Sequence, residues 1–188
     1  MTVVTPIGQP SQGYRPFPDI EARNLNQEMI EIPLMCLLLD LPLGVRVLEV
    51  GCGRGIALPP LAMKLAPRSL TAIDIDAKLV EEAAKHAGER GVPATIQRAD
   101  VRCLPFAGSS FDVVIDFGTC YHIDRADRAL AEIERVLVPG GFLVYETVAA
   151  QLLSHPVRSF GRRLPWRSIP TLLPDRHAGL WATRRKWA

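Results

Sequence analysis

One short stretch of the chain, Glu49-Val50-Gly51-Cys52-Gly53-Arg54-Gly55, follows an apolar, β-branched segment. Glycine has no Cβ, so three glycines at alternate positions let the backbone turn tightly and approach a ligand closely. If a helix begins after the turn, its free N–H groups face the same space. The stretch indicates a nucleotide-binding turn, although the glycines alone are a weak signal because any tight turn needs glycine.

Two aspartates further along the chain have side chains that could bind a nucleoside. Asp74 could accept hydrogen bonds from both hydroxyls of a ribose, or it could cap the next helix, a role for which Asp76 competes. Asp100 could accept from an adenine amine while the N–H of Val101 donates to a ring nitrogen. Alone, Asp100 is typical of a loop or a cap.

The elements that would position these residues alternate between strand and helix. Apolar runs predict strands over 45–50, 70–75, 94–98, 111–117 and 142–148, and helical spacing predicts helices over 58–65, 77–90 and 125–137. This alternation predicts a Rossmann-like, doubly wound α/β fold with a mostly parallel sheet. Because ligands bind at the carboxyl ends of such strands, the three signals should lie together.

The rest of the chain predicts one domain with an N-terminal extension. Residues 1–20 contain four prolines and are expected to form an arm, and 21–188 a single domain. Within it, 21–40 is a helical element, which Pro33 could kink or split, 45–148 the cofactor-binding core, and 149–188 a short C-terminal portion.

Composition excludes several classes of protein. No apolar run is long enough to span a membrane, and the N-terminus has no signal-peptide pattern, so we expect a cytoplasmic location. The four cysteines and four histidines lack metal-ligand spacing, so we expect no metal. The last residues, from Arg158 on, carry a net charge of +7 against −5 for the rest. We interpret this tail as a solvated face, since no nucleic-acid motif accompanies it.

Five segments in this order resemble the class I S-adenosylmethionine-dependent methyltransferases, and the type 11 small-molecule subgroup in particular, which includes ubiquinone and menaquinone C-methyltransferases. They are VLEVGCGRG (47–55), AIDID (72–76), ADVRCLPF (99–106), SFDVV (110–114) and RVLVPGG (135–141). The resemblance covers residues 45–148. It also implies a C-terminal antiparallel strand pair, which must be short here, with 179–185 as the final strand.

The resemblance implies S-adenosylmethionine as the cofactor and a small-molecule methyl acceptor. The residues it assigns to cofactor binding are Glu49, Gly51, Cys52, Gly53, Gly55, Asp74, Ile75, Asp100, Val101 and Phe117. In this assignment the loop after 45–50 holds the methionine part, Asp74 the ribose, Ile75 and Asp100 the adenine, and Phe117 lies beside the sulfonium. The family often has a substrate cap after its fifth strand. Little room exists for one here, so residues 14–39 are the candidate lid.

The segment after the fourth strand would face the acceptor. His122 is the candidate base, or it shapes the pocket, and Tyr121 is a candidate substrate contact or a packing residue. Cys120 is interpreted as a small buried residue. Asp116 could bind a substrate amine or backbone N–H groups, and the sequence does not separate the two.

Three other functions compete with small-molecule methyl transfer. An NAD-dependent oxidoreductase would place its third glycine one position later, where Ile56 stands. A non-catalytic protein that binds S-adenosylmethionine is compatible with the short C-terminus. A nucleic-acid methyltransferase could use the basic tail, but Phe117-Gly118-Thr119-Cys120 replaces the Asn/Asp-Pro-Pro-Tyr type of motif.

Overall fold

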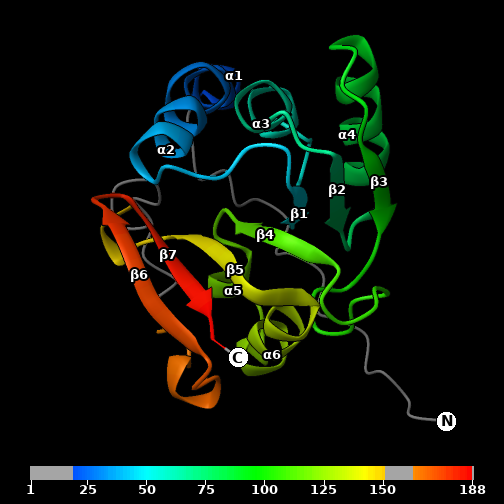
Figure 1. Cartoon of the computed structure of the whole chain (residues 1–188). Helices are drawn as coiled ribbons and strands as arrows, with labels where there is room; N and C mark the ends of the chain where they lie inside the picture. Colours follow the sequence, from blue (N-terminus) through cyan, green and yellow to red (C-terminus); the bar gives the residue numbers. More distant parts are fainter. Residues whose placement is uncertain (1–18, 151–162, 188) are drawn as a thin grey trace, which may run out of the picture.

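Seven strands form one sheet in the computed structural model, which describes residues 19–150 and 163–187 (Figure 1). Their order is β3-β2-β1-β4-β5-β7-β6. They are β1 (Arg46–Val50), β2 (Ser69–Asp74), β3 (Thr95–Arg98), β4 (Phe111–Asp116), β5 (Leu137–Glu146), β6 (Leu172–Ala178) and β7 (Trp181–Lys186). The first five pair in parallel, and β7 runs antiparallel to both β5 and β6. This confirms the predicted fold class, including its antiparallel C-terminal pair.

Helices cover both faces of the sheet (Figure 1). They are α1 (Ile20–Asn26), the π-helix η1 (Gln27–Glu31), α2 (Ile32–Leu38), α3 (Leu58–Leu65), α4 (Ala77–Glu89), α5 (Thr119–His122), α6 (Ala126–Val136) and the 3₁₀-helix η2 (Trp166–Ser168). Neighbouring side chains of β1 enter different cores: Val47 packs with α2, α3 and α4, and Leu48 with α5 and α6. This alternation is the period of a strand buried on both faces.

The single helix expected over 21–39 is divided into α1, η1 and α2. Pro33 stands in the first turn of α2, where its missing N–H costs no hydrogen bond, and the wider π turn lies directly before it. The split allowed for Pro33 is therefore present. Glu28 of η1 is buried and accepts hydrogen bonds from the Arg90 guanidinium, which ties the N-terminal helices to the end of α4.

Element boundaries differ most from the prediction at β5. The strand begins at Leu137, five residues before the predicted start at 142, and includes Gly140 at φ +80°. α6 ends at Val136, one residue before the predicted end, but Pro139-Gly140-Gly141 does not break it, because these residues already belong to β5, which pairs with β4 with a register shift. The final strand is Trp181–Lys186 rather than 179–185, and α5 and β6 were given no bounds by the sequence.

In the part of the chain that the structure describes, no helix is both long and apolar enough to cross a lipid bilayer. Most of the expected N-terminal arm (1–18) and residues 151–162 of the C-terminal portion lie outside the described residues.

Candidate active site

The glycine turn lies between β1 and α3, at the point where the strand order reverses between β1 and β4. Each of its three glycines has a positive φ, but their surroundings differ. A Cβ on Gly51 would stand 1.8 Å from Oγ1 of Thr119, so this glycine is needed for the contact between the β1 and β4 loops. A Cβ on Gly55 would meet Ala83 of α4 at 3.0 Å. A Cβ built on Gly53 would meet no atom within 4 Å, so this glycine borders open space.

Glu49, on β1, is a buried carboxyl with an unused oxygen. It is 3% exposed, and among the residues that the structure describes its Oε2 has no hydrogen-bond partner. Burial, with a smaller contribution from the nearby Asp74, raises the pKa of Glu49 to about 8. A buried polar atom without a partner is rare and costly, so this oxygen is suited to a cationic or N–H donor of a ligand.

Asp74 ends β2 and links two loops of this edge. One carboxylate oxygen accepts from the N–H of Gly53 at 2.9 Å, and the other accepts from Asp76 at 3.0 Å. The helix-capping role belongs to Asp76, whose side chain accepts from Lys78 N–H at 2.8 Å. Each oxygen of Asp74 keeps further acceptor capacity, because a carboxylate oxygen has more than one lone-pair site. Next to it, the Ile75 side chain is exposed.

Asp100 and Val101 follow β3. Asp100 pairs with Arg102, whose Nη2 lies 2.7 Å from Oδ2. Burial raises the pKa of Asp100, but the hydrogen bonds and charge of Arg102 outweigh it, so this pKa lies below its ordinary value. Val101 is buried. If Asp100 contacts an adenine as expected, it does so as a carboxylate that is already paired with Arg102.

After β4, the chain forms the short helix α5. Asp116 is buried, and its carboxylate accepts from the backbone N–H of Thr119 at 2.6 Å and of Cys120 at 3.2 Å. Of the two roles left open for Asp116, the structure shows the backbone one. Cys120 is 1% exposed, as expected of a small buried residue. Phe117 is half-buried against the core that contains α3.

The two candidate substrate residues on α5 differ in exposure. Tyr121 is buried, and its hydroxyl donates to the backbone carbonyl of Glu146 at 2.7 Å. His122 is exposed. The contact places α5 against the end of β5, where a carboxyl that sequence reasoning missed, Glu146, is buried. It lies inside the predicted strand over 142–148 and carries no further signal in the sequence.

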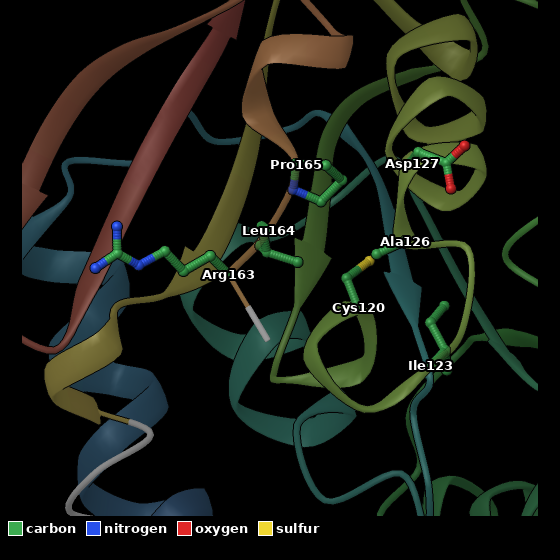
Figure 2. Close-up of a pocket in the computed structure, with 7 residues that line it drawn as sticks. All are labelled: Cys120, Ile123, Ala126, Asp127, Arg163, Leu164 and Pro165. Carbon is green, nitrogen blue, oxygen red and sulfur yellow. The ribbon is translucent and has the colours of Figure 1, made fainter. Parts of the chain in front are cut away.

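A cavity of about 440 Å³ lies on the α5–α6 side of the sheet. Figure 2 shows its lining residues from α5, α6 and the segment before η2: Cys120, Ile123, Ala126, Asp127, Arg163, Leu164 and Pro165. None of the expected cofactor residues lines it. The unpartnered Glu49 and the open space at Gly53, rather than this cavity, mark the candidate cofactor site. Among the described residues, no group of three or more His, Cys, Asp or Glu side chains could hold a metal ion.

Comparisons with known proteins identify the family of the segment that forms this edge of the sheet. A family model described as a methyltransferase domain matches residues 48–145, just over half of the chain. The match covers the segment that carries the resemblance and confirms it.

Two relatives illustrate how much of the chain is shared. A phthiotriol/phenolphthiotriol dimycocerosates methyltransferase of Mycobacterium ulcerans is 33% identical over 129 residues, which cover 64% of this chain and 47% of that protein. A ubiquinone biosynthesis O-methyltransferase of Caulobacter is 29% identical over 128 residues, 68% of this chain and 50% of that protein. The chain thus spans about half the length of these relatives.

Solved structures share the fold. A SAM-dependent methyltransferase from Aquifex aeolicus superposes with a TM-score of 0.70 at 18% identity, covering 89% of this chain and 95% of that one. The [4+2]-cyclase SpnF superposes with a TM-score of 0.57 at 33% identity, covering 61% of this chain and 43% of that one.

Proposed function

Because the chain belongs to the methyltransferase domain family, we propose that it transfers the methyl group of S-adenosylmethionine to a small-molecule acceptor. The cofactor supplies a methyl carbon activated by a sulfonium, which is a good leaving group. The observation that carries the proposal is the unpartnered, buried Oε2 of Glu49 at the switch point of the sheet. An ammonium group is the partner that such an oxygen lacks, and the methionine part of the cofactor has one.

The residues around Glu49 fit the remaining parts of this cofactor. Gly53 borders open space next to Asp74, whose free lone pairs suit the hydroxyls of a ribose. The exposed Ile75 offers an apolar surface for a purine ring. Gly51 and Gly55, in contrast, support the site by allowing close packing with Thr119 and Ala83. Cys52 is buried there, with its thiol close to Glu49 and Asp74.

In this proposal the chain acts mainly by positioning. An in-line displacement requires the acceptor atom, the methyl carbon and the sulfur to lie on one line, and holding them so contributes up to about 7–11 kcal/mol to the lower barrier. Phe117 would support the reacting end of the cofactor, and Asp100 and Val101 its adenine. The N-terminal helices α1, η1 and α2 would exclude water as a lid over the acceptor side, because Arg23 and Glu31 lie close to the end of β5.

The acceptor is proposed to be a small molecule rather than a nucleic acid. The basic residues of the C-terminal strands are used inside the protein: Arg184 stacks over Trp166, Arg185 stacks over Phe142, and Lys186 pairs with Glu134 at 3.3 Å. Such contacts leave less of this charge for a phosphate backbone. The names of two relatives, ubiquinone biosynthesis O-methyltransferase and fatty-acid O-methyltransferase, favour oxygen as the attacking atom.

A second function, catalysis without methyl transfer, is favoured by one comparison. The [4+2]-cyclase SpnF has the same fold at 33% identity, so the fold also serves a reaction of another type. A protein of this kind would bind the cofactor tightly and consume none of it.

Calorimetric titration with S-adenosylmethionine, S-adenosylhomocysteine and NAD tests the proposal. We expect micromolar binding of the first two and none of NAD, followed by S-adenosylhomocysteine release when acceptors are added. Binding of NAD alone would overturn the proposal. Tight cofactor binding without turnover over a broad acceptor screen would favour the second function.

A further inference from the structure

The end of β5 holds a carboxyl group whose surroundings resemble those of Glu49. The Glu146 side chain is 6% exposed, and burial is the largest influence on its carboxyl. Burial disfavours the charged form of a carboxyl, so such a group readily holds a proton. A ligand that brings a proton donor to this position would stabilise the charged form.

Glu146 lies next to the residues expected to face the reacting atoms. A Cβ built on Gly118 would stand 3.3 Å from Oε2 of Glu146 and 3.8 Å from Nε2 of His122. The carboxyl and the imidazole therefore approach the same point of the loop after β4. Gly118 directly follows Phe117, the residue expected beside the sulfonium, and its φ of +91° favours glycine there.

The titratable groups around Glu146 come from four other elements, and one of them is the His122 imidazole of α5, which approaches the same point of the loop after β4. Burial raises the pKa of Glu146 to about 7, Arg23 of α1 lowers it, and Asp116 of β4 and Glu31 of η1 raise it further. Arg23 is also hydrogen-bonded to Gln27, and Asp116 to the backbone of α5. A carboxyl that titrates near neutrality can take up a proton and release it at the same pH.

We propose that Glu146 is the proton acceptor for an acceptor molecule whose reacting group is a hydroxyl or an amine. This inference rests on the proposed methyl transfer. As the bond between the oxygen or nitrogen and the methyl carbon forms, the carbon–sulfur bond breaks and leaves its electron pair on sulfur. The proton of the hydroxyl or amine passes to Oε2 of Glu146, which then releases it to water.

The same surroundings select against anionic acceptors. Among the described residues, the carboxyls of Glu146, Asp116 and Glu31 gather around this position with the Arg23 guanidinium and the His122 imidazole. A carboxylate acceptor would be repelled there, and it would also need no base because it has no proton to lose. The site therefore fits hydroxyl and amine acceptors better than carboxylic acids.

The test compares Glu146→Gln with Glu81→Gln, an exposed carboxyl on α4 far from the site in sequence. S-adenosylhomocysteine production is followed with phenol, benzylamine and benzoate, which share a ring and differ in the reacting group. We expect turnover of phenol or benzylamine, a loss of about 100-fold or more in kcat for Glu146→Gln, and no loss for Glu81→Gln. Glu146→Asp, which keeps a carboxyl, should retain more activity than Glu146→Gln.

A pH profile separates a base from a structural residue. In the wild type, kcat/KM should rise through an apparent pKa near 7, and Glu146→Gln should lose this rise while binding S-adenosylhomocysteine as tightly as the wild type. Unchanged turnover and pH profile in Glu146→Gln, or methylation of benzoate alone, would overturn the inference and leave methyl transfer intact. Failure of the wild type to bind S-adenosylhomocysteine would instead overturn the proposed function.

A carbon NMR titration of the glutamate carboxyls, recorded on the S-adenosylhomocysteine complex, gives a readout that needs no acceptor. One carboxyl that titrates near pH 7 and disappears in Glu146→Gln is expected. Titration of Glu146 in the ordinary acidic range would contradict its role as the base.

Discussion

Carboxyl groups at the two ends of the parallel strands have pKa values shifted in opposite directions. At the amino end of β4, Asp112 accepts hydrogen bonds from the backbone and guanidinium of Arg46 and from Arg68. These hydrogen bonds lower the pKa of Asp112 to about 2, and the hydrogen bond from the Arg46 side chain has the largest effect. At the carboxyl ends of β1 and β5, burial raises the pKa of Glu49 to about 8 and that of Glu146 to about 7.

This difference separates carboxyls that stabilise the fold from the carboxyls that we propose to act on a ligand. Where the chain supplies the partners, ionisation favours the folded state. Where burial comes without partners, ionisation opposes it, and such strain is expected at a functional site. Asp74 and Asp116 refine the comparison, because they lie at the ligand edge but take their donors from the backbone and hold its loops in place.

The largest expected effect comes from Gly51→Ala, which would break the packing of the ligand edge. The new Cβ would overlap Thr119 at a φ of +67°, so we expect a loss of about 3 kcal/mol or more in the free energy of unfolding, measured with urea. Gly44→Ala is the control, since it has a similar φ of +66° and open space around it. Equal losses in the two variants would show that backbone conformation, not the contact with Thr119, requires Gly51.

Glu49→Gln should weaken S-adenosylmethionine binding by about 2 kcal/mol, because it removes a charge-assisted interaction with the cofactor. The same change should raise the stability of the ligand-free protein at alkaline pH. With its pKa raised, Glu49 contributes stability below its unfolded pKa of 4.5, and this is lost as the pH rises through about 8. Calorimetry measures the cofactor affinity, and urea unfolding at pH 9 measures the stability. A variant in which both the affinity and the stability fall, or both rise, would contradict the comparison.

Asp112→Asn should lower the stability of the protein and leave its cofactor affinity unchanged. We expect a loss of about 1–2 kcal/mol in the free energy of unfolding at neutral pH. The loss is smaller than for a buried ion pair, because Arg46 and Arg68 are partly exposed. The pKa of Asp112 is depressed, so its contribution is present above 3.8 and is lost as the pH falls through about 2. A variant that binds the cofactor less well would show that the two edges are coupled.

The smallest expected effect is the number of protons released when the cofactor binds. At pH 7 the free protein holds Glu49 mostly protonated, so pairing with the cofactor ammonium should release most of a proton. Titrations in phosphate and Tris, which differ in ionisation enthalpy, should give different binding heats at pH 7. Identical heats at pH 7 would mean that Glu49 stays protonated in the complex.

The sequence predicted the ligand edge of β1 and β2 far better than that of β4 and β5. Glycines with a set spacing and carboxylates at the ends of strands are local signals, and they located Gly53 and Asp74 on the same edge. Nothing local marked Glu146, because its burial depends on α1, η1 and α5, which come from distant parts of the chain. The start of β5 was missed for a similar reason: pairing with β4 and β7 outweighs the turn propensity of Pro139 and Gly140.

By itself, the sequence determined the alternation of strands and helices, the glycine turn and the family, because these depend on periodicity and on residue types at short spacing. Only the tertiary structure decided which carboxyls have partners. Asp112, Asp116, Glu49 and Glu146 are equivalent as residue types in the chain, and each stands at or near the end of a strand. Hydrogen bonds from Arg46 lower the pKa of Asp112, whereas burial raises the pKa of Glu49, Glu146 and Asp116, in Asp116 despite the hydrogen bonds that it accepts from α5.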